Sequence, residues 1–201
     1  MKTIIKTSLI AIALLMGVNA SAQTPITFGI KAGVNLSNLT GDSDGTKAKI
    51  GFNAGVTVDF GIAQDVYLLT GLEYSLKGAK LSDEGETMKL GLSYIQLPIH
   101  VGYKLAVAEG TNIVFHAGPY LGYLAGGNWS YDGASIGIFS DAGEAISKFK
   151  RFDFGVGLGV GAEFGKIGVG LGWDFGLAKI MDEANVSVKN SNAYLTVGYK
   201  F

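Results

Sequence analysis

From residue 26 to residue 201, apolar residues alternate one by one with polar residues or glycine in eight separate segments. Successive side chains of a strand point to opposite faces, whereas helical faces repeat every 3.6 residues, so this period of two predicts strands. No charged residue lies on the apolar face of any segment. Leu90, Leu92 and Tyr94 fall in the opposite phase, which predicts a bulge or kink near Tyr94–Ile95. The eight segments cover 26–37, 50–61, 68–77, 95–105, 113–123, 151–164, 167–177 and 194–201.

Two kinds of closed barrel are compatible with eight alternating strands. In a soluble barrel the apolar face lines the interior, but eight strands leave too little room for about six large apolar side chains from each. Its exterior would consist largely of glycine, of which the chain has 31. In a transmembrane barrel the apolar face meets lipid, and the glycines and charges face a narrow lumen. We therefore predict an all-β fold, a closed antiparallel eight-stranded transmembrane β-barrel.

The first residues have the pattern of a secretory signal peptide. Lys2 and Lys6 precede an apolar run over 9–18, and an Ala-Ser-Ala site ends at Ala22. This pattern predicts a cleaved signal peptide at 1–22, with the barrel domain at 23–201 beginning at Gln23. The alternative is an N-terminal membrane anchor, but the run is too short to cross a hydrocarbon core of about 30 Å as a helix.

The connections between the segments alternate in length, and this predicts the orientation of the barrel. Outer-membrane barrels keep short turns in the periplasm and longer loops outside, so both termini are expected in the periplasm. Lipid-facing aromatic residues at both predicted interfaces agree with this topology. The long connections are 37–49, 78–88, 125–150 and 179–191, and the short ones are 62–65, 106–111 and 165–166.

The polar face of the segments carries charges of both signs. A charge removed from water must be paired or hydrogen-bonded, which predicts a network inside the lumen. We interpret it as a plug of mutually satisfied charges, with a proton or ion path as the alternative. The glycines of 155–176 either let Tyr94, Tyr120 and Tyr194 pack across the bore or leave a thread of water. The predicted network comprises an outer group (Lys77, Arg151, Asp153), an inner group (Asp59, Lys104, Glu163, Lys200), and Lys31, Glu73 and Asp174.

Catalytic and cofactor chemistry finds little support in the sequence. His100 and His116 lie on neighbouring inward faces, but two histidines without a third ligand make a poor zinc site. We expect hydrogen-bonded lumen histidines, no metal and no cofactor. The chain has no cysteine, and its net charge of -1 provides no basic footprint for nucleic acid. No nucleophile, base and orienting group can be placed together, so we predict that the protein is not an enzyme.

Five short sequence fragments carry a family resemblance. With them the mature chain resembles the small "porin family" outer-membrane β-barrel domain of Gram-negative bacteria. The resemblance implies a place in the outer membrane, contact with its lipid and lipopolysaccharide, and recognition of Tyr199 and Phe201 by the barrel assembly machinery. It implies no catalytic residue, because the family is defined by its fold. The fragments are Tyr94-Ile-Gln-Leu-Pro98, Ala117-Gly-Pro-Tyr120, Phe152-Asp-Phe-Gly155, Phe175-Gly-Leu-Ala-Lys-Ile180 and Tyr199-Lys-Phe201.

The longest connection, 125–150, contains five large apolar residues, which are costly to expose to water. Either they fold over the barrel mouth as a lid, with a short hairpin of their own, or they contact a partner or lipopolysaccharide. We therefore predict a non-enzymatic outer-membrane protein with a structural or surface-binding role through its outer loops. A narrow pore for small solutes is the alternative, and an outer-membrane enzyme is a third. The five residues are Trp129, Tyr131, Ile136, Ile138 and Phe139, of which Trp129, Tyr131 and Phe139 are the candidate binding residues.

Overall fold

The computed structural model describes residues 25–43, 45–83, 86–141, 148–181 and 187–201. The predicted signal peptide, with Ala22 and Gln23, lies outside these residues. Within them no helix is long and apolar enough to cross a membrane. The strands are β1 (Ile26–Gly41), β2 (Thr46–Ala63), β3 (Val66–Asp83), β4 (Glu86–Ala108), β5 (Thr111–Tyr131), β6 (Ala134–Gly137), β7 (Phe152–Phe164), β8 (Ile167–Gly176) and β9 (Val188–Lys200).

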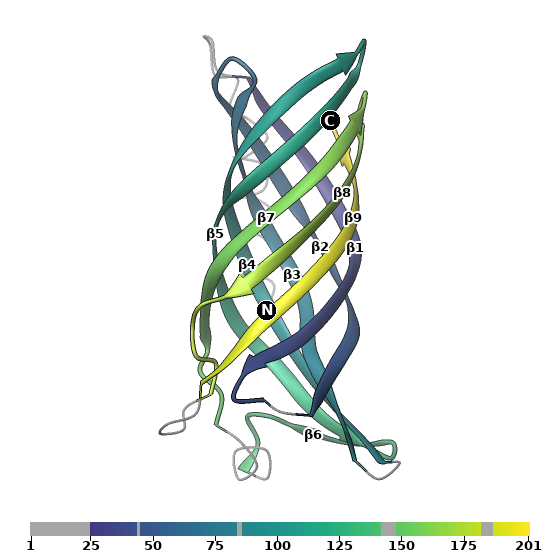
Figure 1. The fold of residues 1–201 in the computed structure, drawn as a ribbon, viewed down its shortest axis with the longest axis vertical. Helices are drawn as coiled ribbons and strands as arrows, with labels where there is room; N and C mark the ends of the chain where they lie inside the picture. The colour runs from purple at the N-terminus through teal and green to yellow at the C-terminus, as the bar shows by residue number, and fades with distance from the viewer. Residues whose placement is uncertain (1–24, 44, 84–85, 142–147, 182–186) are drawn as a thin grey trace, which may run out of the picture.

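Eight of these strands form a closed antiparallel ring (Figure 1), which confirms the predicted fold. Each strand pairs with the next around the ring, and β1 pairs with β9 through positions such as Ala32 and Val197. The strand β6 is additional, because it pairs with β5 beyond the ring. Asp132 and Gly133 join β5 to β6 with φ angles of 44° and 81°. Positive φ angles at both central residues are the requirement of a two-residue type I′ hairpin turn.

The two ends of the barrel differ in their connections. The turns at 64–65, 109–110 and 165–166 lie at one end, the upper end in Figure 1, which we call the short-turn end. The other end carries β6 and is called the long-loop end. Its connections are shorter than predicted, 42–45 instead of 37–49 and 84–85 instead of 78–88. The prediction was wrong here because strand pairing continues through polar residues such as Lys47, Lys80 and Lys89.

Side chains alternate between the wall and the lumen along every strand of the ring. On β9, Leu195 and Val197 are exposed on the outer wall, whereas Asn190 and Asn192 are buried inside. Exposed aromatic residues gather near both ends of the outer wall, with Tyr103, Phe115 and Tyr199 at the short-turn end and Phe52, Tyr74, Tyr123 and Trp173 toward the long-loop end. The apolar wall and the polar interior are the arrangement of a transmembrane barrel.

The predicted bulge in the fourth segment requires a correction. Leu90, Leu92, Tyr94 and Gln96 all point inward, so β4 alternates without a change of phase. The irregularity lies in the partner strand, where Ala125 of β5 is left unpaired between two successive pairs. The apolar residues before Tyr94 point inward because the lumen itself is apolar at the long-loop end.

Candidate functional site

An apolar core fills the lumen at the long-loop end, and we call it the apolar plug. It draws on strands from around the ring and on the connections that flank β6 and β8. Leu90, Leu92, Tyr94, Leu124 and Ile180 have no exposed surface at all (0%). The sequence predicts, each as one of two alternatives, Tyr94 packed across the bore and a lid over the mouth that includes Trp129 and Ile138. It does not predict the inward Leu90 and Leu92, although their opposite phase is a visible signal. The plug consists of Leu39, Ala79, Leu90, Leu92, Tyr94, Leu124, Trp129, Ile138, Phe149, Ile180 and Val188.

The five apolar residues of 125–150 divide between the plug and the surface. Trp129 and Ile138 are buried in the plug, and Phe139 packs against it. Trp129 is therefore an anchor and not a surface contact, contrary to its selection as a candidate binding residue. Tyr131 and Ile136 stay 40% exposed on the β5–β6 hairpin. Because Ile136 lies opposite Trp129, the exposed pair stands on the plug side of this hairpin.

Arg151 does not belong to the lumen network. It is exposed, and its guanidinium lies 3.9 Å from the centroid of the Phe139 ring. The strand β7 begins only at Phe152, so the alternation that predicted an inward Arg151 does not reach it. The side chain instead caps the edge of the apolar plug.

Beneath the plug lies a buried lysine. Lys77 is 1% exposed, and its Nζ lies 3.5 Å from Oδ2 of Asp174. The same Nζ lies 4.7 Å from the ring centroid of Tyr120 and 5.7 Å from that of Tyr94. An ammonium within about 6 Å of an aromatic face is attracted by the ring quadrupole. The carboxylate and two rings together compensate the buried charge.

Asp153 is buried in the same layer and is held by neutral donors. Asn190 donates through Nδ2 to its Oδ2 at 2.8 Å, and the Tyr120 hydroxyl donates to the same atom at 3.3 Å. Asn190 Nδ2 also lies 3.0 Å from the hydroxyl of Tyr94. Gln96 donates to Asp174 at 2.9 Å in the adjacent position. These bonds join the polar part of the lumen to the base of the plug.

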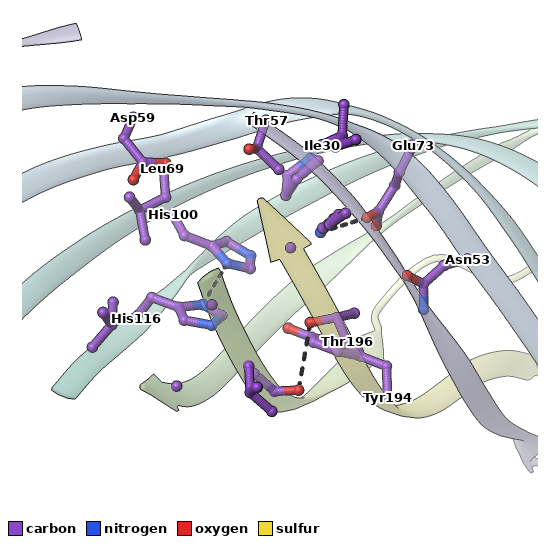
Figure 2. A pocket seen from close by; sticks show the side chains of 18 of the residues that line it. Ile30, Asn53, Thr57, Asp59, Leu69, Glu73, His100, His116, Tyr194 and Thr196 are labelled. Atoms are coloured by element: carbon purple, nitrogen blue, oxygen red, sulfur yellow. Dashed lines mark hydrogen bonds and ion pairs between the residues drawn. The ribbon is translucent and has the colours of Figure 1, made fainter. Parts of the chain in front are cut away.

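A cavity of about 170 Å³ lies in the polar part of the lumen (Figure 2). His100 and His116 line it with their Nδ1 atoms 2.9 Å apart and their ring centroids 5.0 Å apart. Lys31 Nζ lies 2.6 Å from Glu73 Oε2 on another side of the cavity. Since two facing Nδ1 atoms need one proton between them, one histidine donates and the other accepts. Among the described residues, no three histidines, cysteines or carboxylates gather to hold a metal ion.

Four charged side chains meet nearer the short-turn end. Lys104 Nζ lies 2.8 Å from Asp59 Oδ2 and 3.4 Å from Glu163 Oε1. Lys200 binds the same two carboxylates. Two cations and two anions balance, so this group needs no further ion. Tyr199 and Phe201 flank Lys200 on the outer wall and contact each other edge to face.

The glycines of β7 and β8 make room for the large side chains in the bore. A Cβ atom on Gly172 would lie 2.3 Å from the Tyr194 hydroxyl oxygen, and one on Gly159 would lie 2.5 Å from Nε2 of His116. A Cβ atom on Gly155 would lie 2.6 Å from the ring of Tyr120. Of the two alternatives for this glycine wall, the structure therefore has tyrosines packed across the bore.

A family model and one solved structure support this architecture, and two further solved structures are similar to the chain. The family model described as "Outer membrane protein beta-barrel domain" matches residues 4–182. Neisserial surface protein A (NspA) is 13% identical, and the match covers 88% of this chain and 99% of that chain with a TM-score of 0.51. Ail of Yersinia pestis is 17% identical over 87% of this chain and 98% of that chain, with a TM-score of 0.41. OprG of Pseudomonas aeruginosa is 13% identical over 90% and 98%, with a TM-score of 0.42. None of the curated proteins matches the sequence.

Proposed function

This chain belongs to the outer membrane protein beta-barrel domain family and lies in the outer membrane, and on that premise we propose that it is a non-enzymatic, non-conducting protein that acts at the cell surface. The long-loop end faces outward in this proposal, and the short-turn end faces the periplasm with both termini. The observation that carries the proposal is the apolar plug, which closes the bore at the long-loop end.

The plug opposes conduction because an ion entering it would lose its water without gaining other ligands. Its central side chains have no exposed surface, and at its base Asn190 is hydrogen-bonded to Tyr94 and Asp153. Hydrophobic constrictions exclude water and ions from channels in the same way. A narrow pore is the competing function, and the cavity beside His100 and His116 favours it. Conduction would nevertheless require the plug to move.

The β5–β6 hairpin supports a surface-binding role for the long-loop end. Trp129 and Ile138 anchor the hairpin in the plug, while Tyr131 and Ile136 remain partly exposed. Exposed apolar side chains held on a rigid scaffold are typical of recognition sites. The partner in this proposal is a surface that accepts apolar and aromatic contacts.

The orientation can be tested by single-cysteine labelling, because the chain contains no cysteine of its own. Gly133→Cys lies in the hairpin turn and Gly165→Cys in a short turn; both positions have positive φ and no heavy atom within 4 Å of a Cβ. A membrane-impermeant maleimide should label Gly133→Cys in intact cells and Gly165→Cys only after the outer membrane is opened. The reverse pattern would refute the proposal.

A further inference from the structure

A row of lysines crosses three neighbouring strands near the long-loop end. Lys47 of β2 lies opposite Lys80 of β3, and Lys80 lies opposite Lys89 of β4. Directly opposite residues share one face of a sheet, with Cβ atoms about 4.5–5.5 Å apart. The three ammonium-bearing side chains therefore leave the barrel side by side. We call these three residues the lysine row.

The lysine row stands on the outer wall and not in the lumen. Ala79 and Leu90, the immediate neighbours of Lys80 and Lys89, are buried in the apolar plug with no exposed surface (0%). Since side chains alternate between the faces of a strand, Lys80 and Lys89 point away from the plug. Lys47 shares their face because it pairs with Lys80.

No carboxylate forms an ion pair with the row among the side chains that the structure describes, which leave out those of 82–86. The ion pairs found there join other residues, and all of them lie in the lumen. Lys49 places a further cation beside the row. Gly91 shares the outer face of β4 with Lys89, two residues away, and the Nζ of Lys49 lies 3.7 Å from where a Cβ atom on Gly91 would stand. Like charges directly opposite each other destabilise a sheet. An anion bound across the row would remove this repulsion.

The position of the row indicates the kind of anion. Tyr74 on β3 faces lipid, and Lys80 follows it on the same face six residues later. At about 3.3 Å per residue and a tilt near 40°, Lys80 stands roughly 15 Å beyond the aromatic ring of Tyr74 along the barrel axis. The row thus stands on the outer wall beyond the hydrocarbon layer, where its side chains face the polar part of the outer leaflet and not the bore.

We propose that the lysine row binds the phosphate groups of lipopolysaccharide in the outer leaflet. The inference rests on the outward orientation of the long-loop end in the proposed function. Lysine side chains suit this ligand because each acts as a mobile point charge toward phosphate. Ser130 of β5 lies opposite Lys89 and continues the row with a hydroxyl group.

The test measures lipid A binding to the refolded full-length protein in a neutral detergent. The probes are lipid A with both phosphates and the same lipid A with its phosphates removed. The row variant carries Lys47→Gln, Lys80→Gln and Lys89→Gln. The matched control carries Lys148→Gln, Lys179→Gln and Lys189→Gln, which remove the same charge at the same end of the barrel but away from β2–β4. Wild type and control should prefer phosphorylated lipid A, and the row variant should bind it at least 10-fold more weakly.

The melting temperature without lipid separates this role from a structural one. Because the three lysines repel one another, the row variant should melt at or above the melting temperature of the wild type. If the triple variant misfolds, Lys47→Gln alone should reproduce part of the binding loss. Equal binding by the row variant, an equal loss in the control, or no preference for the phosphates would overturn the inference. Equally tight, row-dependent binding of a soluble sulfated polysaccharide would overturn the assignment to lipid. The cysteine labelling judges the orientation independently, so either proposal can fail without the other.

Discussion

Replacing Val197 by arginine places a charge on the lipid-facing wall and, with its control, tests which faces of β8 and β9 meet lipid and lumen. Val197 lies between Ala32 and Val169 in the sheet, with 55% of its surface exposed on the outer wall. It stands two residues from Tyr199 on the same face, inside the aromatic band of the short-turn end. An arginine near the bilayer midplane costs about 2–4 kcal/mol of unfolding free energy. Val197 stands roughly 5 Å inside Tyr199 along the barrel axis, between interface and midplane, so we expect Val197→Arg to cost about 1–3 kcal/mol.

The matched control changes a lumen-facing residue in the neighbouring strand. Gly170 faces inward, and the nearest atom to a Cβ placed there is Thr196 Oγ1 at 3.1 Å. A serine hydroxyl can bond in this polar surrounding, so Gly170→Ser should change stability by no more than about 1 kcal/mol. Urea unfolding in lipid vesicles, followed by tryptophan fluorescence, measures both variants. Equal costs, or a larger cost for Gly170→Ser, would refute the assignment of lipid and lumen faces.

Three further predictions concern the bore and the mouth. Gly172→Ala should lower the unfolding free energy by about 1–3 kcal/mol, because its Cβ would displace Tyr194. Gly168→Ala should be close to neutral, since no atom lies nearer than 3.9 Å to a Cβ there. Equal stabilities of the two variants in urea titration would contradict the packing across the bore. Lys104→Met leaves two buried carboxylates with one cation and should lower the unfolding free energy by about 1–3 kcal/mol. Adding Glu163→Gln to Lys104→Met should recover part of this loss. Strictly additive losses in the double variant would exclude the ion group. Cells carrying Tyr131→Ser with Ile136→Ser should partition less into hexadecane, while the stability of the protein is unchanged. Trp129→Ala should instead lower the unfolding free energy by about 3–5 kcal/mol, because Trp129 is buried in the plug. Unchanged partitioning of the double variant would count against the surface role.

The fold follows from the sequence because lipid imposes one strict requirement on each strand. Positions such as Val197 and Leu195 must be apolar, and their neighbours, which avoid lipid, are free to be polar or glycine. The same alternation indicates which face Lys104 and Asp59 occupy. Depth along the strands also predicts that these two residues form a group with Glu163 and Lys200, and the four meet in the structure. The alternation does not indicate which cation binds which carboxylate, because residues from distant segments meet only after the ring closes.

The apolar plug was missed for a definite physical reason. The predicted lumen contains charges, glycine and, as one alternative, tyrosines, but no aliphatic side chains, so the opposite phase of Leu90 and Leu92 was interpreted as a bulge in β4. Beyond the lipid-facing band, however, a barrel can bury apolar residues inside as any water-soluble protein does. Trp129 and Ile138 lie in a connection without a clear period, so only the three-dimensional packing places them in the plug.

The most direct test of the central claim is single-channel recording of the refolded wild-type protein in planar lipid bilayers, with insertion verified by heat-resistant mobility on gels. A bore closed by the apolar plug predicts no steady current steps in molar salt at either polarity. Well-defined, ohmic steps from the wild-type protein would contradict the account, and the narrow pore would then replace the surface-anchored, non-conducting barrel as its function.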